Sequence, residues 1–248
     1  MTTKVVPGQL VASRDPAQVA KDAAARMVKG LRNAIARNGR ATLALSGGNT
    51  PRDAYGHLAR ESGLDWTKVE IFWVDERAVP PTDDRSNYRW AKATLLDPAG
   101  IAQARVHRMP ADAKDLEAAA RAYDKEIRAH VELGPEGIPA FDVMVLGVGD
   151  DGHTASLFPG EPTVDVVDRL AAAVPAKGSR EARLTVTVPV IEHARAVLIL
   201  AVGAVKRPAL ERVWALQGNV HETPARIVRG CRGAVTWIID KAAGGLTD

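Results

Sequence analysis

The stretch LGVGDDGHTASLFPG, residues 146–160, places a histidine and two acids directly behind an apolar run. Glycines at positions 147, 149 and 152 allow the chain to turn sharply and to approach a ligand closely. Asp150 and Asp151 precede His153, and an imidazole changes its protonation state near neutral pH. These residue types indicate general acid–base chemistry, with His153 as the candidate base.

The other histidines lack such a setting. They lie in helical or strand-flanking segments, and we interpret them as structural or surface residues: His57, His107, His130, His193 and His221. His153 is therefore the histidine that the sequence singles out for chemistry.

A second stretch, SGGNTP at residues 46–51, runs from an apolar segment into an expected helix that Pro51 would open. Glycine allows close approach of the backbone, and unpaired N–H groups with the helix dipole favour an anion such as phosphate. The candidate binding residues are Ser46, Gly47, Gly48, Asn49 and Thr50. A plain turn capped by Asn49 or Thr50 fits the pattern equally well. Neither a P-loop nor a GxGxxG pattern is present, so nucleotide binding gains no support.

A third stretch, VDERAV at residues 74–79, brings three charged residues to the end of another apolar run. A solvated surface cluster is the ordinary interpretation of such charges. Their position at a strand end nevertheless makes Asp75 and Arg77 candidate site residues, whereas Glu76 keeps the surface interpretation. Ser86 or Asn87 is the expected cap of the helix that follows.

The elements that must position these loops alternate between helical and strand patterns. Helices are expected at 16–38, 51–62, 87–96, 113–133, 205–216 and from 224. Apolar strands are expected at 41–45, 69–74, 141–149, 196–202 and 234–240, and an alternating strand begins at 183. Strands that are apolar on both faces and separated by helices indicate an α/β fold with a mostly parallel sheet. We expect one domain over 1–248 and one composite site, because ligands bind at the carboxyl edge of such sheets.

Composition excludes several classes of protein. The net charge of +3 suits an anionic metabolite but is too small and too dispersed for a nucleic-acid track. The single cysteine, Cys231, excludes an internal disulfide framework. No signal peptide or membrane span is apparent, so we expect a cytoplasmic protein. Serine-hydrolase and metal-binding motifs such as GxSxG, HExxH and CxxC are also absent from the sequence.

Together the three loops resemble the 6-phosphogluconolactonase family. The matching segments are SGGNTP, VDERAVPPTDDRSNYRWAKATLL and GVGDDGHTASLFPG, and the likeness extends over roughly residues 40–240. SGGxTP is shared with glucosamine-6-phosphate deaminase, whereas DER combined with DGHTASLFPG is specific to the lactonase. The resemblance implies a modified Rossmann-like α/β fold of the deaminase type and no organic cofactor or catalytic metal.

The resemblance also implies an activity and roles for individual residues. The activity is hydrolysis of 6-phospho-D-glucono-1,5-lactone, the second step of the oxidative pentose phosphate pathway. His153, Arg77 and Asp75 would form the catalytic group, with Asp75 either orienting His153 or binding a sugar hydroxyl. Arg183 of RLTVT and Lys206 of GAVKRPAL would contact the phosphate, with Arg207 as a weaker candidate.

Two other functions stay open at this point. They are deamination and isomerisation of glucosamine 6-phosphate, and sensing of a sugar phosphate without catalysis. The expected partner is a small sugar-phosphate lactone, with no nucleic acid and no membrane. A monomer is the expected state, and the sequence leaves open a weak association with glucose-6-phosphate dehydrogenase.

Overall fold

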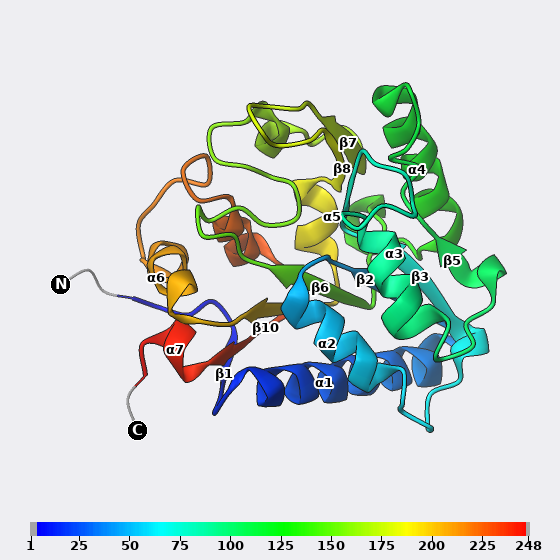
Figure 1. Ribbon diagram of the computed structural model, residues 1–248, viewed down its shortest axis with the longest axis horizontal. Helices are drawn as coiled ribbons and strands as arrows, with labels where there is room; N and C mark the ends of the chain where they lie inside the picture. Colours follow the sequence, from blue (N-terminus) through cyan, green and yellow to red (C-terminus); the bar gives the residue numbers. More distant parts are fainter. Residues whose placement is uncertain (1–3, 247–248) are drawn as a thin grey trace.

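A seven-stranded sheet forms the centre of the protein in the computed structural model, which describes residues 4–246 (Figure 1). Every adjacent pair in this sheet is parallel. From edge to edge the strands are β1 (Gln9–Ser13), β10 (Ala234–Asp240), β9 (Ala196–Ala201), β6 (Val143–Gly147), β2 (Ala41–Leu45), β3 (Val69–Trp73) and β5 (Val106–His107). The expected α/β class with a mostly parallel sheet is confirmed.

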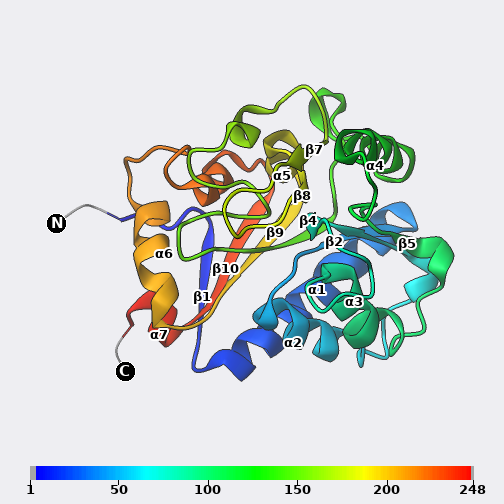
Figure 2. The same ribbon diagram turned by 45° about the horizontal axis from the view of Figure 1, so that its top comes forward.

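Helices cover both faces of the sheet, which is why its inner strands are apolar throughout. In both ribbon views α1 and α2 lie on one side, and α4 and α5 lie on the other (Figures 1 and 2). The α-helices are α1 (Pro16–Asn38), α2 (Asn49–Leu58), α3 (Asn87–Ala91), α4 (Leu116–His130), α5 (Val188–His193), α6 (Arg207–Trp214) and α7 (Lys241–Gly244). Shorter helical turns span Trp66–Lys68, Lys92–Leu96, Gln103–Arg105, Pro135–Gly137, Pro162–Asp165, Ala204–Lys206 and Pro224–Gly230.

The bounds of α1 follow from local sequence signals. The Asp15 side chain accepts a hydrogen bond from the Gln18 N–H, Pro16 opens the helix, and Gly39 ends it in a left-handed conformation. The buried face carries the apolar residues expected at helical spacing, among them Met27 and Leu31. The other predicted helices and strands lie within a few residues of the observed ones, but β1, β5, α5 and α7 were not predicted.

A second sheet, which is antiparallel, was predicted only in part: a strand was expected from residue 183, but none at 75–77 or 171–174. It consists of β4 (Asp75–Arg77), β8 (Arg183–Val186) and β7 (Ala171–Val174), and it lies on the α4 and α5 side of the main sheet (Figure 2). The charged residues that follow the 69–74 strand do not begin a loop, because the backbone of Asp75–Arg77 pairs with β8. None of the helices in residues 4–246 has the length and apolar character needed to cross a membrane.

Candidate active site

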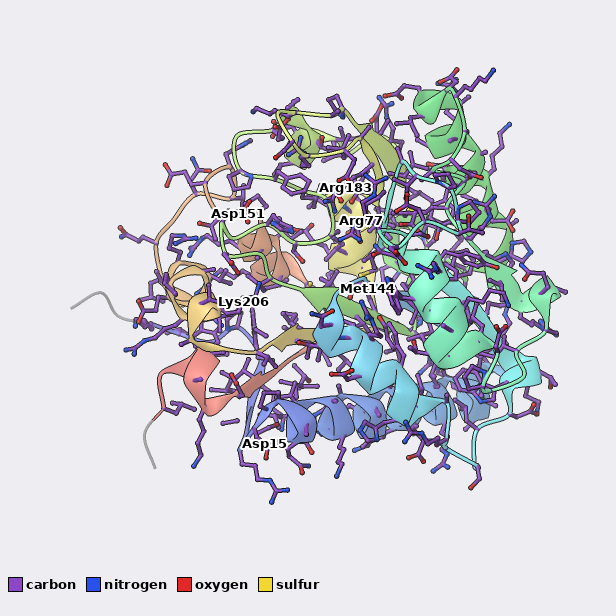
Figure 3. All side chains as sticks on the ribbon, viewed as in Figure 1. Asp15, Arg77, Met144, Asp151, Arg183 and Lys206 are labelled. Atoms are coloured by element: carbon purple, nitrogen blue, oxygen red, sulfur yellow. The ribbon has the colours of Figure 1, made fainter. Side chains whose placement is uncertain are left out.

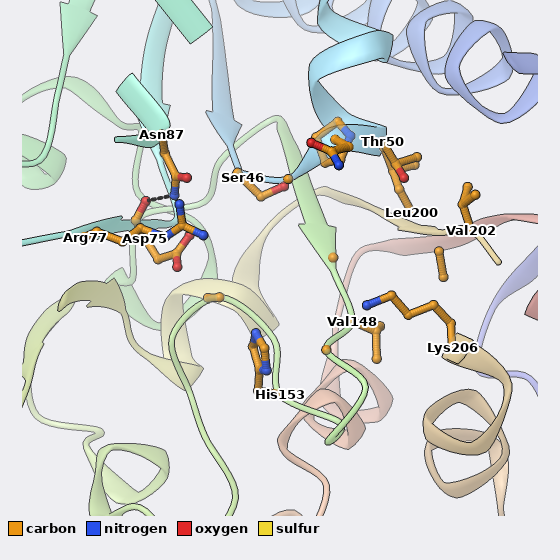
Figure 4. Close-up of a pocket in the computed structure, with 18 of the residues that line it drawn as sticks. Ser46, Thr50, Asp75, Arg77, Asn87, Val148, His153, Leu200, Val202 and Lys206 are labelled. Carbon is orange, nitrogen blue, oxygen red and sulfur yellow. Dashed lines mark hydrogen bonds between the residues drawn. The ribbon is translucent and has the colours of Figure 1, made fainter. Parts of the chain in front are cut away.

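A cavity of about 460 Å³ opens where β2, β6 and β9 end and β4 begins. This volume suits a small metabolite. All the residues singled out for a role in the site line it, except the weaker candidate Arg207: Ser46, Gly47, Gly48, Asn49, Thr50, Asp75, Arg77, His153, Arg183 and Lys206. Figure 4 shows His153, the Lys206 ammonium and the Arg77 side chain on different walls, with Ser46 and Thr50 on a further wall. The expected convergence of three loops on one cavity is therefore observed.

Residues 46–50 line the cavity at the start of α2. Helix α2 begins at Asn49, two residues before the predicted Pro51, and no side chain of the described residues caps its first turn. This excludes the alternative in which Asn49 or Thr50 acts as a cap. Gly48 has φ +109°, and a Cβ on Gly47 would lie 1.9 Å from the Asn87 side-chain oxygen, so both positions require glycine. The N–H groups of an uncapped first turn lack intrahelical partners, which favours the binding of an anion there.

Arg77 and Arg183 stand opposite each other on the antiparallel pair β4–β8. Figure 3 shows their labels close together above the main sheet. Like charges directly opposite on a sheet repel, and the buried Nε atoms of both arginines have no hydrogen-bond partner among residues 4–246. Burial lowers the pKa of the Arg183 guanidinium, and neighbouring Arg77 lowers it further while Asp75 opposes this. An anion in the cavity would reduce this repulsion and would accept hydrogen bonds from the unpaired donors.

Asp75 lies on the same face of β4 as Arg77 and is held by several partners. Its Oδ2 accepts a hydrogen bond from Ser156 Oγ at 2.7 Å and lies 3.6 Å from an Arg183 Nη. Its Oδ1 accepts from Asn87 Nδ2 at 3.2 Å, and the same amide donates to the Asp75 backbone oxygen at 2.9 Å. No hydrogen bond joins Asp75 to His153 among the described residues. The geometry therefore disfavours Asp75 as the residue that orients His153.

His153 is oriented instead by Asp151. The Asp151 Oδ1 lies 2.6 Å from His153 Nδ1 and accepts the His153 main-chain N–H at 3.0 Å. Burial raises the pKa of the Asp151 carboxyl, but the hydrogen bonds and the charge of His153 outweigh this and lower it to about 2. Asp151 thus accepts a hydrogen bond from His153 Nδ1. In the neutral imidazole the other nitrogen, Nε2, then carries the lone pair. The Phe158 ring packs at 4.6 Å from the imidazole.

Glu76 is a buried structural residue, contrary to the surface interpretation. Because side chains alternate along a strand, it points away from the face that carries Asp75 and Arg77. Its carboxylate accepts hydrogen bonds from the backbone N–H groups of Arg77, Asn87 and Tyr88 and from the Ser86 hydroxyl. Burial raises its pKa, with these hydrogen bonds opposing the rise. Glu76 fixes the start of α3 and with it Asn87.

Lys206 enters from the far side of the site. Its Nζ forms a 2.7 Å ion pair with Asp150 Oδ1, and the ammonium points into the cavity (Figure 4). Arg207, the weaker candidate, contacts Glu211 at 3.3 Å and does not line the cavity. The expected role of Lys206 thus has a structural basis that Arg207 lacks.

Sequence reasoning missed three residues that position the site. Asn87 was named only as a helix cap, and the actual cap is Ser86, whose Oγ accepts the Arg89 N–H. Ser156 and Phe158 belong to the singled-out 146–160 stretch; Ser156 donates to Asp75, far away along the chain, whereas Phe158 packs against His153 within the same stretch. The signal that could have revealed them was their place in that stretch.

Known proteins resemble this chain over most of its length. The family model described as glucosamine-6-phosphate isomerases/6-phosphogluconolactonase matches residues 14–237. A 6-phosphogluconolactonase of Synechocystis sp. is 43% identical over 85% of this chain and 86% of its own length. The structure of 6-phosphogluconolactonase from Trypanosoma brucei has a TM-score of 0.85 at 27% identity, covering 96% of this chain and 98% of its own. A monomeric glucosamine-6-phosphate deaminase of 21% identity, covering 96% of this chain and all of its own, shares the fold with a TM-score of 0.80.

Proposed function

Because the chain belongs to the glucosamine-6-phosphate isomerase/6-phosphogluconolactonase family and is an enzyme of the lactonase type, we propose how it hydrolyses its substrate. The substrate is 6-phospho-D-glucono-1,5-lactone, and the product is 6-phospho-D-gluconate, in the pentose phosphate pathway. His153 activates the attacking water. The 46–50 loop, Lys206 and Arg183 hold the phosphate.

The phosphate end of this proposal rests on unpaired donors. The uncapped first turn of α2 supplies N–H groups, and the buried Nε of Arg183 has no hydrogen-bond partner within the described part of the chain. Lys206 adds a positive charge, which Asp150 partly neutralises until a phosphate dianion competes for it. Charge-assisted hydrogen bonds of this kind are about twice as strong as neutral ones. Binding a remote phosphate orients the reacting carbon at the other end of the substrate.

The reacting end rests on the Asp151–His153 pair. Neutral His153 donates from Nδ1 to Asp151 and presents Nε2 to a water molecule. As the water oxygen attacks C1 of the lactone, Nε2 takes the proton and the carbonyl electrons move onto oxygen. Arg77 stabilises that negative charge, because its guanidinium faces the same cavity. The bond from C1 to the ring oxygen then breaks, and imidazolium returns the proton to the departing oxygen.

Asp75 has a positioning and binding role in this mechanism. Its carboxylate is already engaged by Ser156 and Asn87 and lies close to Arg183. From there it holds the Arg183 guanidinium at the wall and can accept a hydrogen bond from a sugar hydroxyl. Of the two roles expected for Asp75, hydroxyl binding is the one we retain.

The observation that carries the proposal is that His153, the α2 first turn and the cationic side chains share one cavity. The test is hydrolysis of lactone generated in situ, followed by acid release above the spontaneous rate. Replacing a general base costs roughly 10²–10⁴ in rate, so His153→Gln should lose that much kcat. His221→Gln is the matched control, because His221 lies outside the cavity.

Full activity in folded His153→Gln would contradict the assigned base. Ammonia release from glucosamine 6-phosphate, measured in parallel, would instead support the deaminase alternative. Tight binding of 6-phosphogluconate without turnover of the lactone would indicate a sensor.

A further inference from the structure

A second group of titratable side chains lies away from the cavity, at the β5 edge of the main sheet. His107 comes from β5, while Glu126 and His130 are four residues apart on α4 and therefore share one face of that helix. Each of the three brings one nitrogen or oxygen atom to within 4.8 Å of the other two. None of them lines the candidate active site.

Glu70 supports the His107 ring from its far side. His107 Nε2 lies 2.9 Å from Glu70 Oε2, and Arg105 pairs with the other oxygen of the same carboxylate. With this geometry the Glu70 carboxylate accepts the N–H of His107 Nε2. A carboxylate on one ring nitrogen is the usual support for a histidine that binds a metal through the other.

The other nitrogen of His107 faces a second carboxylate. His107 Nδ1 lies 2.6 Å from Glu126 Oε1, so two lone-pair atoms would meet unless a positive charge lies between them. Stacking of the imidazole on Phe72, at 4.4 Å between ring centres, fixes its plane. Either a proton or a metal ion supplies that charge.

His130 distinguishes the two sources. Its ring centre lies 4.2 Å from that of His107, and its Nδ1 lies 3.6 Å from Glu126 Oε1. A single proton shared by His107 and Glu126 would not involve the imidazole of His130. A metal ion, in contrast, would bind this imidazole as a third ligand. His130 Nδ1 donates to the Glu126 main-chain oxygen at 3.1 Å, and its side chain is 38% exposed, so ring rotation can direct the lone-pair nitrogen inward.

We propose that His107, Glu126 and His130 bind a late first-row divalent cation of the Zn²⁺ class. Two imidazoles and one carboxylate form a donor set that Zn²⁺ accepts, with water or a fourth ligand completing a tetrahedron. Ligand bonds of about 2.0–2.1 Å require donor atoms about 3.3 Å apart. Glu126 must therefore move away from His107 by several tenths of an ångström, which its exposed position on the surface of α4 permits.

Such an ion would fasten α4 to the edge of the sheet. Strand β5 has two residues and is paired on one side only, to β3. The bound cation would join this short strand to α4 through three bonds. Its effect is on stability, because the site is separate from the residues proposed for catalysis.

The experiment measures zinc binding by full-length protein that has been dialysed against a chelator. Equilibrium dialysis with ZnCl₂ counts the ions, and a melting scan with and without zinc reports their effect on folding. CoCl₂ provides a second probe, because the visible absorption of bound Co²⁺ reports four-coordinate geometry. The variants are Glu126→Gln and His130→Gln, both on the partly exposed surface of α4. The controls are His221→Gln and His153→Gln, the second of which removes the imidazole of the active site.

We expect one zinc ion per chain, retained in both controls and bound at least tenfold more weakly in Glu126→Gln and His130→Gln. Zinc should raise the melting temperature of wild type but not of these two variants. The proposal is overturned if wild type binds no zinc, if His130→Gln binds it like wild type, or if the bound ion disappears in His153→Gln. These results do not depend on lactonase activity, so the site can fail while the proposed function holds.

Discussion

Asp151 accepts a hydrogen bond from the His153 ring, with 2.6 Å between Asp151 Oδ1 and His153 Nδ1. The two residues are separated by Gly152, whose φ of +93° folds the chain back so that the carboxylate also accepts the His153 main-chain N–H. The pair is therefore built by a single tight turn. It determines which nitrogen of His153 faces the cavity.

Asp151→Asn should lower kcat about tenfold to a hundredfold with little change in KM. The amide loses a charge-assisted hydrogen bond, whose loss costs about 1.5–3 kcal/mol. The matched control is Asp150→Asn, because Asp150 contacts Lys206 rather than His153. Equal effects of the two substitutions on kcat would refute the positioning role. Steady-state kinetics on the phosphorylated lactone separates kcat from KM.

The Asp151 carboxyl should also leave a signature in the pH dependence of stability. Its native pKa of about 2 lies below its usual value of 3.8. The folded state thus favours the charged form, and the resulting stabilisation is present above pH 3.8 and is lost as the pH falls through 2. Urea midpoints of wild type and Asp151→Asn should accordingly differ at pH 5 and converge as the pH approaches 2. A difference that persists unchanged at pH 2 would exclude this linkage.

Lys206→Met should raise KM by about tenfold to a hundredfold, because the phosphate loses a charged donor that contributes roughly 1.5–3 kcal/mol. Methionine keeps most of the aliphatic length of lysine. Arg207→Met removes the neighbouring charge, which pairs with Glu211 outside the cavity, and should leave KM near the wild-type value. If both variants weaken binding equally, general electrostatic attraction rather than a specific contact is responsible. Product inhibition by 6-phosphogluconate gives a second measure of the same contact.

Gly47→Ala should impair activity much more than Gly56→Ala. A Cβ at Gly47 would lie 1.9 Å from Asn87 Oδ1 and would push that side chain off Asp75. At Gly56, inside α2, the nearest atom is 3.5 Å away on the flexible Arg60 side chain, and alanine favours a helix by up to about 1 kcal/mol. Lactonase assays with melting scans distinguish the two outcomes. Wild-type activity in Gly47→Ala would show that Asn87 can move without cost.

Glu76→Gln should destabilise the fold by about 1–3 kcal/mol and also reduce activity. The glutamine NH₂ group cannot accept the hydrogen bonds that the carboxylate receives from Asn87 and Tyr88, so buried donors lose their partner. Glu61→Gln, at an exposed position three residues beyond α2, is the control and should be neutral. Urea unfolding measures the difference in stability. Unchanged stability would mean that the donors at the start of α3 find other acceptors.

Local patterns in the sequence determined the alternation of helices and strands and the loops that carry the site. Apolar runs such as 41–45 and 69–74 read as buried strands because both faces of a covered parallel sheet avoid water. Caps such as Asp15 and Gly39 act over three or four residues, so their signals are local. The loops after three strands met at one edge because parallel strands all end on the same side.

Only the tertiary structure decided the pairing of side chains within that edge. Arg77 and Arg183 are neighbours because β4 pairs with β8, a contact across more than a hundred residues of chain. The same pairing turns Glu76 away from the cavity and brings Asp75 within reach of Ser156. The joining of His107 to α4 likewise depends on packing between distant segments. Hydrogen bonds and ion pairs form between atoms that lie within a few ångströms of each other. For segments far apart in the sequence, only the folded chain brings the atoms that close, so local sequence patterns do not reveal these contacts.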